Sequence, residues 1–137
     1  SVMYGMKRIK DDVFIFVTYH KKQTKDISKK YVDGKPDYDD IFESNQIFCW
    51  DTQLGKGINS SYSQSVITAS RKHLMVQKRD RQIKFYYLGQ FDILEVKSAK
   101  KLNQKGEEQD IAKFRVKMRN PVREDIWQYF LSNVDEE

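Results

Sequence analysis

The sequence predicts an α+β fold, with a single domain built on one twisted, barrel-like and mostly antiparallel sheet and a few short helices. Three observations support this prediction. The chain has 137 residues, of which 39% are hydrophobic, so it is long enough to bury one core. Several segments have the β-branched, aromatic or alternating composition of strands. Only two segments carry apolar residues at helical spacing.

The strands are predicted in chain order from these patterns. Val13–Tyr19 is apolar on both faces, which is typical of a central strand. In Gln46–Thr52, alternation places Cys49 and Asp51 on one face and Trp50 on the other. The other predicted strands are His73–Arg79, Ile83–Leu88, Phe91–Val96 and Ile111–Met118.

Helices and loops account for the remaining chain. A helix is predicted over Tyr62–Ser70, after N-cap candidates at residues 59–61, and a second over Arg123–Leu131. One helical turn is expected within Asp37–Ser44. The polar and charged segment Lys97–Asp110 is predicted to be a surface loop.

One segment differs in charge from the rest of the chain. Pro36–Leu54 contains five acidic residues and no Lys or Arg, and Tyr38–Gln53 within it contains four aromatic residues. Residues 1–35 carry nine basic and four acidic side chains, and residues 55–105 carry eleven basic and three acidic ones. The net charge of +5 favours polyanionic partners, among them nucleic acid.

The residue inventory excludes several kinds of site. A single cysteine cannot form a disulfide framework, which favours a reducing, cytoplasmic setting. The cysteine and the two histidines lack the spacing of metal ligands, so we expect no metal, no cofactor and no catalytic set in this segment. Alternation with aromatic neighbours predicts that Cys49 is a buried, inert thiol. No apolar run is long enough for a membrane span, and we expect the segment to be the C-terminal part of a longer polypeptide.

One enzymatic alternative stays open. Pro36-Asp37 and Glu95-Val96-Lys97 together spell the PD…ExK string of a broad nuclease superfamily. In such a site two carboxylates hold Mg²⁺ while the lysine assists the attacking water. The two acids are 58 residues apart in this chain, and so short a string arises easily by chance, so the nuclease is the less favoured reading.

The acidic and aromatic segment predicts a pocket for a nucleobase. Aromatic rings stack on bases, and a carboxylate can accept a hydrogen bond from the N4 amino group of cytosine. A base-flipping pocket needs both kinds of group. For Trp50, a place in the core is an equal alternative. The pocket candidates are Tyr38 and Trp50 as stacking rings, Asp39 or Asp40 as the acceptor from N4, and Gln53 for the polar edge of the base.

Basic residues outside this segment are candidates for contacts with DNA phosphates, with a merely solvated surface as the alternative. They lie in a lysine-rich loop, after the first predicted helix and in the predicted loop before the last strand. The candidates are Lys21, Lys22, Lys25, Lys29, Lys30, Arg71, Lys72, Lys97, Lys100, Lys101 and Lys105.

The order of five short motifs resembles that of a C-terminal domain of unknown function found in bacterial DEAD/DEAH-type helicases. In that family the second motif usually ends in Trp-Gln-Ser-Gln, and Trp50-Asp51-Thr52-Gln53 departs from it at the two middle residues. The resemblance covers residues 13–131. The five motifs are FVTY (16–19), YDDIFESNQIFCWDTQ (38–53), HLMVQKR (73–79), YYLG (86–89) and NPVREDIWQYF (120–130).

Some members of this family end SauUSI-type, ATP-dependent and modification-dependent (type IV) restriction enzymes. The resemblance therefore implies an SRA-like fold that recognises 5-methyl- or 5-hydroxymethylcytosine in double-stranded DNA. It also implies, as partners, the helicase motor and the phospholipase-D-like nuclease of the same polypeptide. The alternative is an intramolecular or protein-docking module without base recognition. A basic concave surface with a pocket would favour the reader, and a flat apolar patch would favour the docking module.

Overall fold

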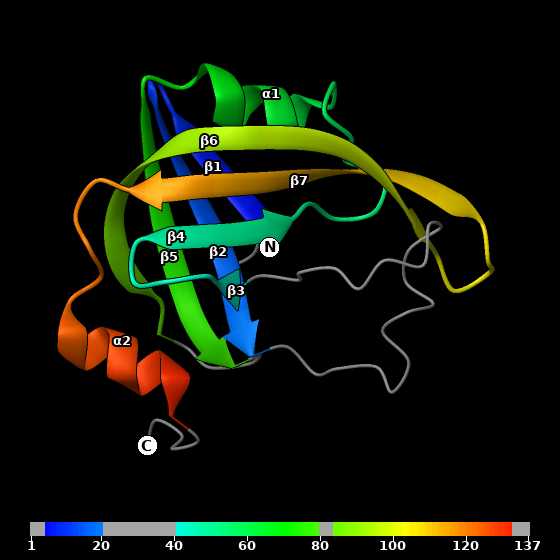
Figure 1. Cartoon of the computed structure of the whole chain (residues 1–137). Coiled ribbons are helices and arrows are strands. Elements are labelled where there is room, and N and C mark those ends of the chain that lie inside the picture. Colours follow the sequence, from blue (N-terminus) through cyan, green and yellow to red (C-terminus); the bar gives the residue numbers. More distant parts are fainter. Residues whose placement is uncertain (1–4, 21–40, 80–83, 133–137) are drawn as a thin grey trace.

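Seven strands and two helices follow one another along the described chain (Figure 1). The computed structural model describes residues 5–20, 41–79 and 84–132. Among these residues, no helix is long and apolar enough to cross a membrane. The elements are β1 (Gly5–Ile9), β2 (Asp12–His20), β3 (Ile41–Phe42), β4 (Ile47–Asp51), α1 (Ser61–Thr68), β5 (Arg71–Arg79), β6 (Tyr86–Leu102), β7 (Glu108–Met118) and α2 (Glu124–Leu131).

The strands form one mixed sheet in the order β1-β2-β5-β6-β7-β4-β3. β2 and β5 are parallel, and every other neighbouring pair is antiparallel. The α+β class and the twisted, mostly antiparallel sheet are therefore confirmed. The sheet is open, with β1 and β3 at its two edges.

The long strand β6 joins two halves of this sheet. Its first residues pair with β5, and its residues from Phe91 to Leu102 pair with β7. Bulges occur in both ladders, and Gly89, with a φ of 105°, lies beside the first of them. Figure 1 shows β6 curving so that β1, β2 and β5 cross behind β4 and β7. The two halves thus face each other across one core.

The core is filled by alternate residues of both halves. Val13 and Leu74 come from the β2–β5 half, and Phe48, Trp50 and Phe114 come from the β4–β7 half. The rings of Trp50 and Phe114 are stacked, with centroids 4.7 Å apart. The predicted alternation in β4 is confirmed, because Trp50 faces the core and Asp51 faces outward.

Two short helices cover the ends of this core, as predicted. α1 begins after Ser60, whose side-chain oxygen accepts a hydrogen bond from Ser63 N at 3.1 Å. α2 buries Phe130. Buried Lys78 ties α2 to β5, because its Nζ donates to Ser132 Oγ at 2.8 Å and lies 4.5 Å from the centre of the Tyr129 ring.

Three predictions about local structure are wrong. Ile83–Leu88 and Phe91–Val96 are not separate strands, because β6 runs without a break from Tyr86 to Leu102. Segment 97–110 is not a loop, because β6 continues to Leu102 and pairs with β7 from Glu108 onward. This part of the hairpin extends beyond the core, so it lacks the apolar alternation by which strands are recognised. Within Asp37–Ser44, Ile41 and Phe42 form strand β3 rather than a helical turn, and residues 37–40 lie outside the described part.

Candidate nucleic-acid interface

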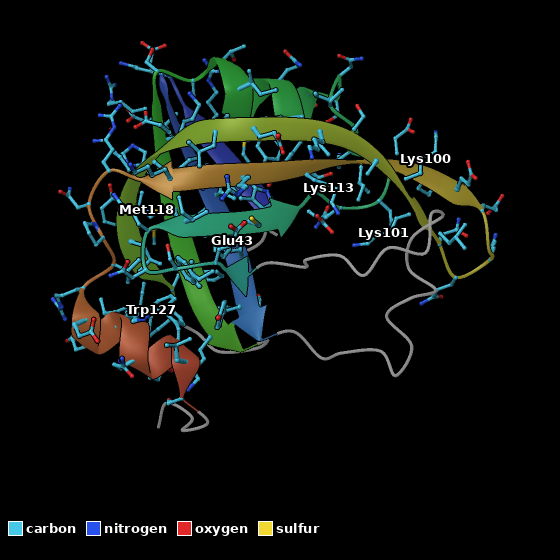
Figure 2. All side chains as sticks on the ribbon, in the orientation of Figure 1. Glu43, Lys100, Lys101, Lys113, Met118 and Trp127 are labelled. Atoms are coloured by element: carbon cyan, nitrogen blue, oxygen red, sulfur yellow. The ribbon has the colours of Figure 1, made fainter. Side chains whose placement is uncertain are left out.

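The outer side of the β3–β4–β7–β6 half carries charged residues that pair with one another. Alternation along these strands turns the side chains away from the core. Figure 2 shows Glu43, Lys101 and Lys113 along β4 and the β6–β7 hairpin. We call this surface the charged face, and it consists of Glu43, Cys49, Asp51, Glu95, Lys97, Lys101, Lys113, Arg115 and Lys117.

Glu43, directly after β3, binds two groups of the charged face. Arg115 Nε and Nη2 each donate to its carboxylate at 2.9 Å, and the Cys49 thiol donates to Oε2 at 2.8 Å. Hydrogen bonds from Arg115 and from Cys49 lower the pKa of Glu43 to about 2. Burial, and then the bond to Glu43, raises the pKa of Cys49 to about 12. The thiol is therefore protonated at neutral pH and unreactive, and its predicted burial is confirmed.

Asp51, at the end of β4, is a buried acid between two cations. Its side chain is 4% exposed, Lys101 Nζ lies 3.5 Å from its Oδ2, and Lys113 Nζ lies 4.0 Å from its Oδ1. Without this carboxylate, the two ammonium groups would repel each other in a poorly hydrated place. Asp51 therefore stabilises the hairpin against β4.

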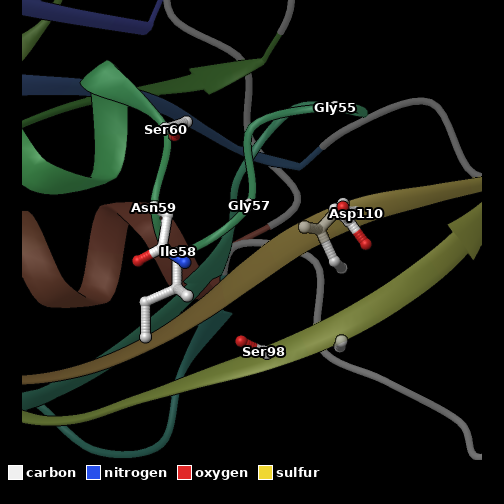
Figure 3. Close-up of a pocket in the computed structure, with 9 residues that line it drawn as sticks. Gly55, Gly57, Ile58, Asn59, Ser60, Ser98 and Asp110 are labelled. Atoms are coloured by element: carbon white, nitrogen blue, oxygen red, sulfur yellow. The ribbon is translucent and has the colours of Figure 1, made fainter.

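A cavity of about 280 Å³ lies where the chain leaves β4 and crosses the hairpin. Figure 3 shows the loop that carries Gly57 and Asn59 beside the strands that carry Ser98 and Asp110. The lining therefore combines an amide, hydroxyls and a carboxylate with apolar carbon atoms. The lining residues are Gly55, Gly57, Ile58, Asn59, Ser60, Ser98, Ala99, Asp110 and Ile111.

Backbone hydrogen bonds hold this loop against β7. Thr52 N donates to Ala112 O at 2.9 Å, and Gly55 N donates to Asp110 O at 2.8 Å. A Cβ at Gly57 would lie 3.0 Å from Asp110 Cβ, which is closer than side chains normally approach. The close approach of loop and strand therefore favours glycine at this position.

Two of the five predicted base-pocket residues lie in the described part of the chain. Trp50 is 2% exposed, and the rings of Phe114 and Phe91 pack against it. This corrects the prediction that it stacks on a base, because its position in β4 faces the core. Gln53 is exposed in the turn after β4. The other three candidates, Tyr38, Asp39 and Asp40, lie outside the described residues.

Six of the eleven predicted phosphate-binding residues are described, and five of these six bind protein acceptors. Lys105, in the turn of the β6–β7 hairpin, is exposed, and its ammonium group has no partner among the described residues. The other five pairs are Arg71 with Asp12 at 2.7 Å, Lys72 with Ala69 O, Lys97 with Glu95 at 3.2 Å, Lys100 with Asp110 at 2.7 Å and Lys101 with Asp51 at 3.5 Å. Lys21, Lys22, Lys25, Lys29 and Lys30 lie outside the described residues.

Sequence reasoning missed four residues of this region. Lys56, between the two cavity glycines, and Lys117, on β7, are exposed, and their ammonium groups have no partner in the described part of the chain. Asn59 and Asp110 line the cavity. The available signal was the Gly-Lys-Gly sequence shortly after a predicted strand, a pattern that commonly marks no more than the end of a strand.

The described residues do not form the metal site that the nuclease alternative needs. Glu95 and Lys97 point to the same side of β6 and form an ion pair with each other at 3.2 Å. Asp37 lies outside the described residues. In the ranges that the structure describes, no group of three or more His, Cys, Asp or Glu side chains could hold a metal ion.

Comparison with known proteins places the chain in a family. No curated protein matches it. The family model described as Domain of unknown function (DUF3427) matches residues 1–130, which is nearly the whole length. The chain therefore belongs to the DUF3427 family.

Proposed function

We propose that this domain binds double-stranded DNA and recognises 5-methyl- or 5-hydroxymethylcytosine as the target reader of an ATP-dependent, type IV restriction enzyme. The modified base is flipped out of the duplex into the cavity beside the β6–β7 hairpin. Its partners are then the helicase and nuclease domains of the same polypeptide, in the cytoplasm, and this segment itself catalyses nothing. The cavity is the observation that carries the proposal, and the net charge of +5 and the resemblance to helicase-associated domains agree with it.

The cavity offers the groups that would recognise a modified cytosine. Asp110 Oδ1 is bound by Lys100, and Oδ2 has no partner among the described residues, so it can accept from the N4 amino group. The Asn59 amide nitrogen carries two N–H groups, and it can donate to N3 and O2 of the base, which both accept. Ala99 gives apolar surface for a substituent at C5, worth about 0.8 kcal/mol per buried carbon.

Two lysines near this cavity and hairpin are suited to bind phosphate. Lys56 lies within the cavity loop and Lys105 at the hairpin turn, and neither ammonium group is paired within the described ranges. Each would replace a condensed counterion when DNA binds. We expect Lys56→Ala to reduce the slope of log affinity against log salt by about one unit, equally for modified and plain duplexes.

The decisive experiment measures gel shifts on matched duplexes that carry plain, 5-methyl- or 5-hydroxymethylcytosine. Asp110→Ala should lower affinity for the modified duplex by about 5- to 150-fold, because a base-edge hydrogen bond is lost. Its affinity for the plain duplex should stay unchanged if plain cytosine remains stacked in the duplex and only the phosphates are contacted. The matched control is Asp125→Ala, which removes another exposed, ion-paired acid, on α2.

Three outcomes would contradict the proposal at different points. If Asp110→Ala keeps the wild-type ratio of affinities, the base is not read in this cavity. If the wild-type protein binds all duplexes equally, the domain does not read modified cytosine. If it binds no duplex at any salt concentration, the docking module becomes the better explanation.

A further inference from the structure

The outer side of the β1–β2–β5 half carries aromatic rings. Alternation along β2 and β5 turns Phe14, Phe16 and His73 away from the hydrophobic core. Phe14 and His73 are stacked with ring centres 4.4 Å apart, and the Tyr87 ring centre lies 5.7 Å from that of His73. Three neighbouring strands thus contribute one row of rings. We call this surface the aromatic face, and it consists of Lys7, Phe14, Phe16, Arg71, His73, Phe85 and Tyr87.

The ring of Tyr87 is 51% exposed, and hydrogen bonds fix its position. Its hydroxyl lies 2.8 Å from His73 Nδ1, and His73 Nε2 lies 2.8 Å from Asp12 Oδ1. Because a carboxylate only accepts, Nε2 carries a proton and donates to Asp12, while Nδ1 shares a second hydrogen bond with the Tyr87 hydroxyl. Arg71 donates to both oxygens of Asp12, at 2.7 and 2.8 Å. The ring is therefore oriented before any ligand binds.

Cations lie beside these rings. Lys7 on β1 is exposed, stands opposite Phe14 in the ladder and has no partner among the described residues. Arg71 is half-exposed, and its Nη1 makes no hydrogen bond within the described part of the chain. Arg71 and Asp12 neutralise each other, so the available positive charge beside the rings is that of Lys7.

We propose that the aromatic face binds single-stranded nucleic acid, with an unpaired base stacked on Tyr87. In a duplex the faces of the stacked bases are covered by their neighbours, whereas the unpaired bases of a single strand can offer them to an exposed ring. Stacking on aromatic side chains displayed by a sheet, with cations at the phosphates, is a general way of binding single strands. A polyanion fits the unpaired charge of Lys7 better than an apolar protein surface does. This inference does not depend on the modified-cytosine site, which lies in the other half of the sheet.

Fluorescence anisotropy with labelled oligo-dT and oligo-U of about 15 nucleotides tests the proposal. Tyr87→Ala should weaken binding by about 5- to 150-fold, because one stacked base is lost. Tyr87→Phe keeps the ring and should bind within about threefold of the wild type. Leu94→Ala is the matched control, since Leu94 is 48% exposed and lies in the other half of the sheet. Lys7→Glu should weaken binding and reduce its dependence on salt.

The outcomes separate this proposal from the duplex reader. Binding of either oligonucleotide that depends on Tyr87 and Lys7 but not on Leu94 supports it, and a preference between dT and U shows that the 2′-hydroxyl or the C5 methyl group affects binding. If Tyr87→Ala binds the oligonucleotides as tightly as the wild type does, the proposal is overturned. A protein partner is then the better candidate for the aromatic face. Duplex binding by the same variants is measured in parallel, so loss of one activity with retention of the other shows which proposal failed.

Discussion

The charged face and the aromatic face are the outer sides of the two halves of one sheet, and their polar groups have different roles. On the charged face, Glu43 is satisfied by Arg115 and Asp51 lies against lysines, so the ion pairs hold β3, β4 and the hairpin together. On the aromatic face, the chain of hydrogen bonds from Asp12 ends at the half-exposed ring of Tyr87. β6 contributes to both faces, so the difference comes from the strands that pair with it on each side. Paired charges stabilise one half, and oriented rings are left available on the other.

The Trp50 ring lies in the core between the two halves of the sheet. Its removal should therefore lower the stability of the fold, and with it both faces, more than any other substitution proposed here. Trp50→Ala should lower the free energy of unfolding by about 3–5 kcal/mol, because it leaves a large cavity against Phe114 and Phe91. Trp50→Phe should cost less, since the indole Nε1 makes no hydrogen bond within the described part of the chain. Urea unfolding measures both variants. A loss below about 1 kcal/mol for Trp50→Ala would show that the ring is not part of the core.

Asp51 provides a test of the charged face alone. Asp51→Asn keeps the shape of the side chain but removes the charge that separates Lys101 from Lys113. We expect the free energy of unfolding to fall by about 1–3 kcal/mol, because the negative charge that offsets the repulsion between the two lysines is lost in a largely buried place. Asp125→Asn, an exposed acid on α2, is the control and should change stability much less. Equal effects of the two variants would mean that Asp51 has no special structural role.

Much of the fold could be predicted from the sequence, because its elements have local signals. The apolar strand at Val13–Tyr19, the alternation around Trp50 and the cap at Ser60 each depend on neighbouring residues. The parallel pairing of β2 with β5 has no such signal, because the paired residues are 59 positions apart in the sequence. Continuity of β6 through Gly89 was missed, because glycine normally marks a break and here accommodates a bulge.

The candidate sites were harder to predict because they depend on pairings between distant segments. Asn59 and Asp110 line one cavity only because the loop after β4 is hydrogen-bonded to β7. His73 and Tyr87 meet through the β5–β6 ladder, and Asp12 joins them through the parallel pair. The composition indicated that acids, aromatic rings and lysines take part in binding. It could not indicate which of these residues the fold brings together.

Glu43 should have the smallest effect on stability, yet it tests most directly how the charged face is held. Its pKa in the folded protein is lowered to about 2 from the ordinary 4.5, so its pairing with Arg115 stabilises the fold above a pH of about 4.5. This stabilisation is lost as the pH falls from about 4.5 through about 2, where the folded-state carboxylate is protonated. Glu43→Gln should therefore be slightly less stable than the wild type at neutral pH, and the difference should disappear in acid. Thermal unfolding at several pH values measures this.

The same substitution should alter the Cys49 thiol, for which burial and then Glu43 raise the pKa to about 12. Without the carboxylate, the pKa of Cys49 should fall toward its ordinary value, so the thiol should react faster with a disulfide reagent at mildly alkaline pH. Glu95→Gln is the control, because Glu95 pairs with Lys97 on the same face and makes no hydrogen bond to the thiol. If the Cys49 thiol reacts with the reagent at the same rate in Glu43→Gln and in Glu95→Gln, burial alone protects the thiol. In that case the charged face is held by Arg115 and its strand neighbours rather than by the contact between Glu43 and Cys49.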